Sequence, residues 1–526
     1  MLRRTFLKNG LGLAAVCALP QAGHALAPNA VGMHRFFSTS DRRWQAAYDK
    51  AERILSANVQ RLPLYDRPVL IEGADYAGIW QECGPHEALV YHSFRPGVAR
   101  NSHDIFFALQ RPDGQLPANS KRSETGFGQI QMVVPIAATA WELAQTTGDS
   151  RFLERAYAAC ERWDAWLTRY RNTRGTGLIE GFCTYDTGMD NSPRWAGIPV
   201  RCPDKDAKRM PPIATLPRLC PDLSATVYGA RSALAAMAAA LGKQSDADIW
   251  RDRAEKIRRL ILERLYLPDD AVFYDLDAQN RFVRVRSDIL TRVCGERVVD
   301  QKIFEQMWQR QLGNPQAFWP PYPFPSIALN DSVFVRPIPP NSWGGASQAL
   351  TALRATRWMD HYGRSAELAH LMDQWCRALR HDMTFRQQLD PLNGAFTWGG
   401  STNYSPASLA MIEFTWRLAG VREEGEELHW NIRPGVSVSR SAYFQAKLRY
   451  GTAAIRYRKR AATLALAGRL VAEVHGTARL VTDTKGKPLY LLGISMTAQA
   501  VTLHLPGKPR QRISLLPNQR YAVNQR

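Results

Sequence analysis

Residues Thr184–Trp195 read TYDTGMDNSPRW and interrupt a chain that is otherwise rich in helical patterns. Gly188 and Pro193 disfavour a regular helix, so this stretch is expected to form a loop. Asp186 and Asp190 stand four residues apart in it, between aromatic side chains. Carboxylates beside aromatic rings are typical of sugar sites, because rings stack on apolar sugar faces and acids exchange protons with oxygen atoms. An ordinary turn rich in Asp and Asn is the alternative interpretation.

Helical patterns occur in pairs on both sides of this loop. The clearest cover residues 128–147 and 150–171, then 223–241 and 245–265, and finally 343–362 and 365–381. Short turns join the two helices of a pair, and long irregular loops join one pair to the next. This alternation, repeated about six times, predicts a mainly α domain in which helical hairpins form an (α/α)6 toroid. The long loops would gather at one end of the ring and form a pocket.

From about residue 424 the pattern changes to short alternating strands separated by turn residues. The prediction for residues 424–526 is a small β-sandwich. It is expected to cover one side of the helical ring, and a separate glycan-binding role is the alternative. The predicted helical domain covers residues 28–423.

Residues 1–27 have the features of an export signal. A basic start with Arg3 and Arg4 precedes a short apolar run, and small residues near Ala27 fit a cleavage site. The paired arginines resemble a twin-arginine signal. No later apolar run is long enough to span a membrane, so the mature chain is predicted to be a soluble periplasmic protein that does not insert into the membrane.

The composition is that of a globular protein with a basic surface. Lys and Arg outnumber Asp and Glu by 68 to 48, which gives a net charge of +20. The basic residues are scattered and no nucleic-acid motif accompanies them, so a carbohydrate is the expected partner and nucleic acid is not. The charge leaves an anionic substrate as a secondary expectation. The sequence leaves the oligomeric state open.

Seven cysteines follow the predicted signal, and an odd number excludes complete internal pairing. Cys202 and Cys220 flank a proline-rich insertion, and a disulfide between them is plausible in an oxidising compartment. The chain has no Cys-x-x-Cys or His-rich spacing, so neither a metal site nor a cofactor is expected.

Four sequence blocks, in this order, resemble the α-toroid glycoside hydrolases of the trehalase and processing α-glucosidase group, which includes mannosylglycerate-hydrolase-like proteins. The blocks are LQRPDGQLP (109–117), DTGMDNSPR (186–194), FPSIALNDSVF (324–334) with NSWGGASQALTAL (341–353), and FRQQLDPLNG (385–394) with YSP (404–406). No single block is specific, but the ordered set is.

The resemblance implies inverting hydrolysis of a glycosidic bond, in which one acid protonates the leaving oxygen and a carboxylate activates water. Asp190 matches the general acid of the family. At the usual position of the base stands Gln387, and an amide cannot accept the proton. The candidates for a relocated base are Glu82, Glu87, Asp390 and Asp331.

Other side chains are predicted to bind the sugar. Gly344 and Ala346 stand where the family has an Arg and a Pro after Trp343, so that sugar-binding Arg is absent. The candidates for substrate binding are Asp186, Arg194, Trp195, Trp343, Gln387, Trp398 and Tyr404.

Two alternatives to hydrolysis remain at this stage. A polysaccharide lyase acting on uronate-containing glycans would explain Gln387 and the basic charge, and its chemistry would use His86, His92, Arg95 and Tyr91. A non-catalytic glycan-binding protein would explain the missing base equally well.

Overall fold

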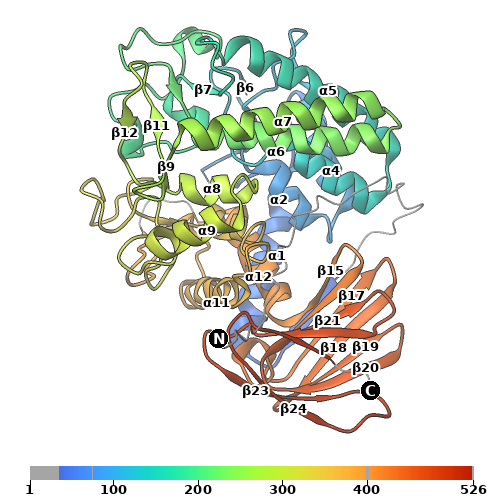
Figure 1. Ribbon diagram of the computed structural model, residues 1–526. Coiled ribbons are helices and arrows are strands. Elements are labelled where there is room, and N and C mark those ends of the chain that lie inside the picture. The colour runs from blue at the N-terminus through green and yellow to red at the C-terminus, as the bar shows by residue number, and fades with distance from the viewer. Residues whose placement is uncertain (1–34, 74, 398–401, 524–526) are drawn as a thin grey trace, which may run out of the picture.

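The computed structural model describes residues 35–73, 75–397 and 402–523 (Figure 1). The predicted export signal and Trp398 lie outside the described residues. Among the described helices, none combines the length and the apolar character that a membrane span requires.

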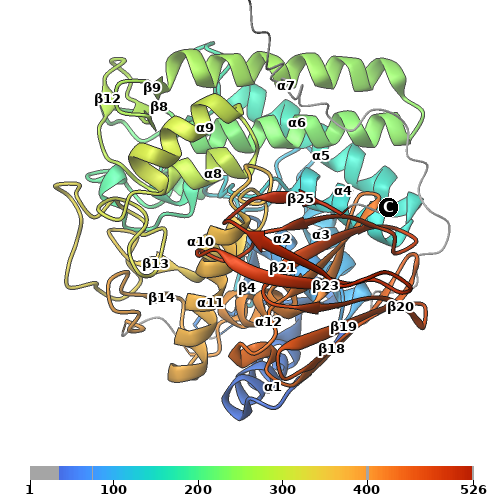
Figure 2. The ribbon, with the colours of Figure 1, turned by 60° about the horizontal axis from the view of Figure 1, so that its bottom comes forward.

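The first part of the chain is mainly helical. The α-helices of the described residues are α1 (Arg42–Ala57), α2 (Gly84–Tyr91), α3 (Pro96–Ala108), α4 (Ile136–Thr147), α5 (Ser150–Tyr170), α6 (Pro221–Ala240), α7 (Gln244–Arg264), α8 (Ile289–Gly295), α9 (Gln301–Met307), α10 (Ala349–Ala355), α11 (Ser365–Asp382) and α12 (Ser405–Ala419). The long helices α6 and α7 run side by side, as both ribbon views show (Figures 1 and 2).

Local sequence explains several helix ends. Asp149 precedes α5, and its side chain accepts a hydrogen bond from the Phe152 N–H at 2.9 Å, which satisfies a free donor of the first turn. Gly148 ends α4 with a φ of 66°, in the left-handed region that glycine adopts without strain. The predicted start of a helix at residue 128 was wrong, because α4 begins only after Pro135.

The start predicted at Trp343 was also wrong, since α10 begins at Ala349. The Val335 N–H donates to the Gly344 carbonyl at 2.8 Å, and Ser347–Gln348 pair with another short strand. These contacts hold the segment before α10 in extended form.

Small sheets connect the helices. Their strands are β2 (Val59–Leu62) with β3 (Tyr65–Leu70); β4 (Gly78–Trp80), β5 (Asn119–Lys121) and β6 (Thr125–Gly126); β7 (Glu180–Gly181), β8 (Arg218–Leu219), β11 (Asp275–Leu276) and β12 (Phe282–Val283); β9 (Tyr266–Leu267) with β10 (Val272–Phe273); and β13 (Ser347–Gln348) with β14 (Gln388–Leu389). These strands hold the long loops of the helical part in fixed positions.

The C-terminal part consists of two antiparallel sheets. The larger has the order β1 (Arg35–Thr39), β17 (Ala442–Leu448), β18 (Gly451–Arg458), β19 (Ala461–Leu466), β20 (Arg469–His475), β23 (Gln499–His504) and β24 (Gln511–Leu515). The smaller has the order β15 (Val421–Glu424), β16 (Glu427–Ile432), β21 (Ala478–Asp483), β22 (Pro488–Leu492) and β25 (Arg520–Ala522). The pairing of the N-terminal β1 with β17 was not predicted.

The two parts of the chain share one hydrophobic core. Asp360 in the helical part accepts hydrogen bonds from Arg422 at 2.6 Å and from Arg479 at 3.0 Å, both in the smaller sheet. Although burial opposes its charge, these guanidinium groups lower the pKa of Asp360 far below its ordinary value. The helical part and the sheets are thus joined by a partly buried ionic contact as well as by apolar packing.

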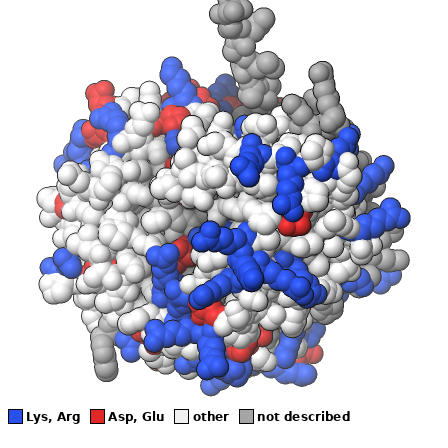
Figure 3. Space-filling view, turned by 90° about the horizontal axis from the view of Figure 1, so that it is seen from below, with Lys and Arg blue, Asp and Glu red and all other residues white. Residues whose placement is uncertain are grey.

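The C-terminal part carries much of the positive charge. Residues 424–526 contain seventeen Lys and Arg but only five Asp and Glu. On the face seen from below, Lys and Arg gather in the centre and toward the lower and right sides, with few Asp and Glu among them (Figure 3). This charge is a surface property and does not explain the fold.

Candidate active site

A cavity of about 130 Å³ opens among the loops of the helical part. It is lined by Glu72, Tyr76, Trp80, Glu82, Asn119, Lys121, Gln129, Gln131, Tyr185, Gly188, Asp190, Arg201, Trp343, Leu350, Gln387 and Tyr404. The lining combines three carboxylates with five aromatic rings. This is the chemistry that the sequence predicted for the loop around Asp190.

Asp190 follows a 3₁₀ turn, Thr184–Thr187, and its carboxylate faces the cavity. Its Oδ2 accepts a hydrogen bond from Asn341 Nδ2 at 3.2 Å. Burial raises the pKa of Asp190 to about 6, although Asn341 and Arg201 act to lower it. A carboxylic acid with this pKa can hold a proton at mildly acidic pH and donate it.

Glu82 lies between β4 and α2 and is nearly inaccessible to solvent. Its Oε2 atom has no hydrogen-bond partner among the described residues. Burial raises the pKa of Glu82 to about 7; Arg354 lowers this pKa and the nearby Asp190 raises it. Glu82 is the one candidate for the relocated base that lines the cavity with Asp190.

Glu72 is a third carboxylate of the cavity, and sequence reasoning missed it. Tyr404 donates its hydroxyl hydrogen bond to Glu72 Oε1 at 2.5 Å. Burial, reinforced by the charges of Glu87 and Glu82, raises the pKa of Glu72 well above its ordinary value. The available signal was the run VLIEGADY, in which an acid stands a few residues before an aromatic residue, as Asp190 does.

Gln387 belongs to a chain of hydrogen bonds that leads to the acid. The Tyr76 hydroxyl donates to Gln387 Oε1 at 3.0 Å, and Gln387 Nε2 donates to Asn341 Oδ1 at 3.1 Å. Asn341 in turn donates to Asp190. The amide at residue 387 therefore accepts one hydrogen bond and donates another, which a carboxylate at the same place could not do.

Two predicted aromatic residues also line the cavity, Trp343 and Tyr404. Both are buried, and the Arg292 guanidinium lies 5.4 Å from the ring centroid of Trp343. Trp80, Tyr76 and Tyr185 add aromatic surface that the sequence analysis did not single out.

Asp186 lies outside the cavity lining. It forms a fully buried ion pair with Arg171 at 2.5 Å, and its carboxylate also accepts hydrogen bonds from the backbone N–H groups of Ile130, Phe182 and Cys183. With these partners Asp186 fixes the base of the acid-bearing loop and is not available to a sugar. We therefore revise the expectation that it binds substrate.

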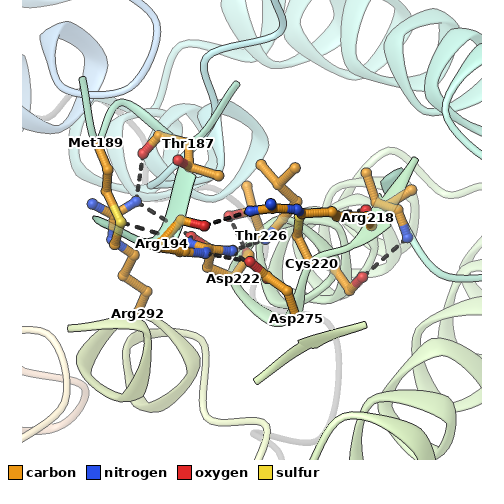
Figure 4. Close-up of polar contacts among 12 residues, drawn as sticks. Thr187, Met189, Arg194, Arg218, Cys220, Asp222, Thr226, Asp275 and Arg292 are labelled. Carbon is orange, nitrogen blue, oxygen red and sulfur yellow. Dashed lines mark hydrogen bonds and ion pairs between the residues drawn. The ribbon is translucent and has the colours of Figure 1, made fainter. Parts of the chain in front are cut away.

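Arg194 and Trp195 also lie outside the lining. The Arg194 guanidinium is buried between Asp222, at 2.8 Å, and Asp275, at 2.6 Å (Figure 4). Trp195 is buried, and its Nε1 donates to the Thr187 hydroxyl at 3.0 Å. Both side chains hold the loop in place, so their predicted contact with substrate is revised as well.

The other base candidates do not line the cavity. Asp390 pairs with Arg336 at 3.1 Å, and Asp331 pairs with Arg286 at 3.3 Å. Glu87 is buried on α2, outside the lining, and neither of its oxygens has a hydrogen-bond partner within the described part of the chain.

The predicted Cys202–Cys220 disulfide is not formed. All seven described cysteines are free and buried. Cys220 directly precedes α6 and its thiol donates to the Arg218 carbonyl at 3.4 Å, whereas Cys202 lies beside Cys183. Two clusters of cysteine and aspartate side chains are compact enough for a metal ion, but Arg171 and Arg194 already neutralise their carboxylates.

A cavity with this lining is that of a carbohydrate-active enzyme. Residues 76–405 match the family described as the mannosylglycerate hydrolase MGH1-like glycoside hydrolase domain, and the chain belongs to this family. The protein is a glycoside hydrolase, and the lyase and the non-catalytic glycan-binding protein are set aside. His86, His92, Arg95 and Tyr91, named for the lyase, do not line the cavity. No curated protein matches the sequence.

Solved structures share the fold at low sequence identity. The GH63 mannosylglycerate hydrolase from Thermus thermophilus in complex with glucose is 20% identical, with a TM-score of 0.55 over 70% of this chain and 99% of that chain. The neutral trehalase from Saccharomyces cerevisiae is 13% identical, with a TM-score of 0.54 over 70% and 80% of the two chains. The GH78 rhamnosidase of a Bacillus species is 13% identical, with a TM-score of 0.55 over 84% and 40%.

Proposed function

We propose that the protein hydrolyses a glycosidic bond with inversion, with Asp190 as the general acid and Glu82 as the general base. The observation that carries this proposal is the presence of both carboxyl groups in one cavity, each with a pKa raised by burial, to about 6 for Asp190 and about 7 for Glu82. Groups that titrate near neutral pH can both hold and release a proton during turnover.

In the proposed reaction, protonated Asp190 gives its proton to the glycosidic oxygen as the bond to the sugar breaks. Ionised Glu82 removes a proton from a water molecule, which attacks the sugar carbon from the opposite face. The two carboxyl groups must therefore be in opposite protonation states. Gly188, which has no side chain, leaves the Glu82 carboxylate room beside the loop that carries Asp190.

The role proposed for Gln387 is to position the acid. Its amide orients Asn341, and Asn341 holds the Asp190 carboxylate by the hydrogen bond at 3.2 Å. A neutral amide here also avoids a further negative charge near Asp190, which would raise the pKa of the acid.

The substrate we propose is a glycoside that carries a carboxylate, such as the mannosylglycerate for which the family is named. Lys121 and Arg201 line the cavity and provide positive charge. Lys121 is paired with Glu124 at 2.9 Å, whereas Arg201 lies over the ring of Tyr185 at 5.5 Å. A guanidinium group binds a carboxylate through two hydrogen bonds, so Arg201 is the proposed contact.

The finer features of fold and location are also proposals. The helical hairpins are proposed to close into an (α/α)6 toroid with the cavity at one end, which the likeness to trehalase supports. Residues 1–27 are proposed to direct export to the periplasm and then to be removed after Ala27. The mass of the protein recovered from a periplasmic fraction would test the cleavage site.

The experiment that tests the function is incubation of the mature protein with neutral glycosides, glycerate glycosides and uronate-containing glycans. Reducing ends and ultraviolet absorbance are followed together. We expect reducing ends without absorbance, and turnover lower by about 10²–10⁴-fold in the Asp190→Asn or Glu82→Gln variant. Undiminished turnover in both variants would overturn the proposed assignment.

A further inference from the structure

The two ends of the acid-bearing loop bring two thiols together. The ligand atoms of Cys183, Asp186 and Cys202 all lie within 4.8 Å of one another. Cys183 and Cys202 are 0% and 3% exposed, and with Phe182 they form a small apolar cluster apart from the main core. The 18 residues between the two cysteines, 184–201, include four that line the cavity: Tyr185, Gly188, Asp190 and Arg201.

The backbone around the pair holds the two thiols in this position. The Thr184 and Tyr185 N–H groups donate to the carbonyls of Pro199 and Val200 at 3.0 and 3.1 Å, so the two ends of the loop run alongside each other. The Cys202 N–H donates to the Gly128 carbonyl at 3.0 Å. The juxtaposition of the thiols thus follows from the fold.

We infer that Cys183 and Cys202 form a disulfide bond that closes the loop carrying Asp190. This inference is independent of the proposed substrate and mechanism. Formation of the bond removes two protons and two electrons from the thiols. An oxidant of the disulfide class accepts them, as when oxidised glutathione becomes two molecules of reduced glutathione.

The surroundings of the two thiols indicate which of them attacks the oxidant first. Cys202, which accepts a hydrogen bond from the Arg171 guanidinium at 3.7 Å, is the more exposed of the two thiols. Burial raises the pKa of the Cys183 thiol. Cys202 therefore attacks the oxidant and releases one glutathione thiolate. Cys183 then attacks the Cys202 sulfur, which forms the internal bond and releases the second glutathione.

A disulfide accounts for this cluster better than a metal ion does. Both oxygens of Asp186 already accept hydrogen bonds from Arg171 and from backbone N–H groups. The guanidinium occupies the place next to this carboxylate where a cation would bind. A disulfide needs no change in these contacts. It would restrain the segment that supplies the catalytic acid, because a bond across a loop limits its accessible conformations.

The test uses the chain without residues 1–27, folded and treated with oxidised glutathione, then quenched in acid and alkylated in denaturant. We expect two of the seven thiols to be lost, a mass lower by two hydrogen atoms, and a protease fragment that joins Cys183 to Cys202. The Cys202→Ser variant should lose no pair of thiols, whereas the Cys220→Ser variant should still lose two. Seven alkylated thiols, or a fragment that joins Cys202 to Cys220, would overturn the inference.

The restraint that the disulfide places on the loop can be measured separately. Hydrogen exchange of peptides within residues 184–201 should slow in the oxidised protein and return to its earlier rate after reduction. Peptides from α7 serve as the internal control, because that helix is outside the loop. Equal exchange in the oxidised and reduced proteins would overturn the claim that the bond restrains the acid.

Discussion

The carboxylate of Glu82 lies directly against Gly188, two residues before Asp190. A Cβ atom built on Gly188 would lie closer to Glu82 Oε2 than Cβ atoms approach other heavy atoms in proteins. Gly188 also has a φ of 65°, in the left-handed region. The position of Glu82 beside the acid-bearing loop therefore depends on the absence of a side chain at residue 188.

The Gly188→Ala variant is expected to lose at least about tenfold in kcat/KM, because the added methyl group displaces the Glu82 carboxylate. Gly197→Ala is the matched control. Gly197 has a φ of 77° in the same loop, but a Cβ there would meet open space. It carries the same backbone strain, of about 1 kcal/mol, without the displacement. Equal losses in the two variants would show that Glu82 is not the group affected.

The roles of Asp190 and Glu82 can be separated by the leaving group of the substrate. A general acid is needed only when the leaving oxygen must be protonated. Asp190→Asn should therefore lose about 10²–10⁴-fold on an alkyl glycoside and much less on a glycosyl fluoride, whose leaving group needs little help. Glu82→Gln should be slow on both substrates, because each needs an activated water. Kinetics with the two substrates check this, and a fluoride substrate that rescues Glu82→Gln would reverse the assignment.

The activity should have a narrow bell-shaped dependence on pH. The reactive form needs protonated Asp190, whose pKa is about 6, and ionised Glu82, whose pKa is about 7. Because the pKa of the acid lies below that of the base, the population of this form changes little between the two values, and activity falls below about pH 6 and above about pH 7. The two limbs overlap, and only a minority of molecules is in the reactive form at the optimum, at about pH 6.5.

The Asn341→Ala variant tests which limb of this pH profile Asp190 controls. Asn341 donates to Asp190 and lowers the pKa of this acid. Its removal should raise the pKa of Asp190 toward that of Glu82, so the acid limb of kcat/KM should move to higher pH while the alkaline limb stays nearly in place. A shift of the alkaline limb alone would mean that Asn341 acts on the pKa of the base.

The sequence led to those parts of the site that lie within continuous motifs. Asp190, Trp343 and Tyr404 belong to blocks that resemble the family, and all three line the cavity. Glu72 and Asn341 were missed because their roles depend on distant partners. Tyr404 is 332 residues from Glu72 in the chain, and Asn341 is 151 residues from Asp190.

The same dependence on distant partners explains why some residues that were predicted to bind sugar lie outside the cavity. Arg194 stands in the acid-bearing block, and nothing local shows that Asp222 and Asp275 will enclose it. Helix pairs were easier to predict, since apolar periodicity is a local property. Strand β1 was not, because its partner β17 lies about four hundred residues further along the chain.

Replacement of Arg194 by methionine should destabilise the protein by about 3–5 kcal/mol, because buried Asp275 would lose its counter-charge and Asp222 would keep only Arg292, at 3.4 Å. Urea unfolding measures this change. Arg155→Met is the control, since the Arg155 side chain is half exposed and its pair with Asp104 should contribute less than about 1 kcal/mol. If Arg194→Met instead raised KM with no loss of stability, Arg194 would be a substrate-binding residue after all.

Glu87 should make stability depend on pH although it does not line the cavity. Burial raises its pKa from 4.5 to about 7, so the folded state binds its proton more tightly than the unfolded state. This contribution is complete below pH 4.5 and is lost as the pH rises through 7. Glu87→Gln stays neutral and should therefore be more stable than the native protein at pH 8, by about 1–3 kcal/mol, but not at about pH 5. Urea unfolding at both pH values tests this, with the exposed Glu255→Gln as a control that should change neither. A gain of equal size at both pH values would show that folding does not raise the pKa of Glu87.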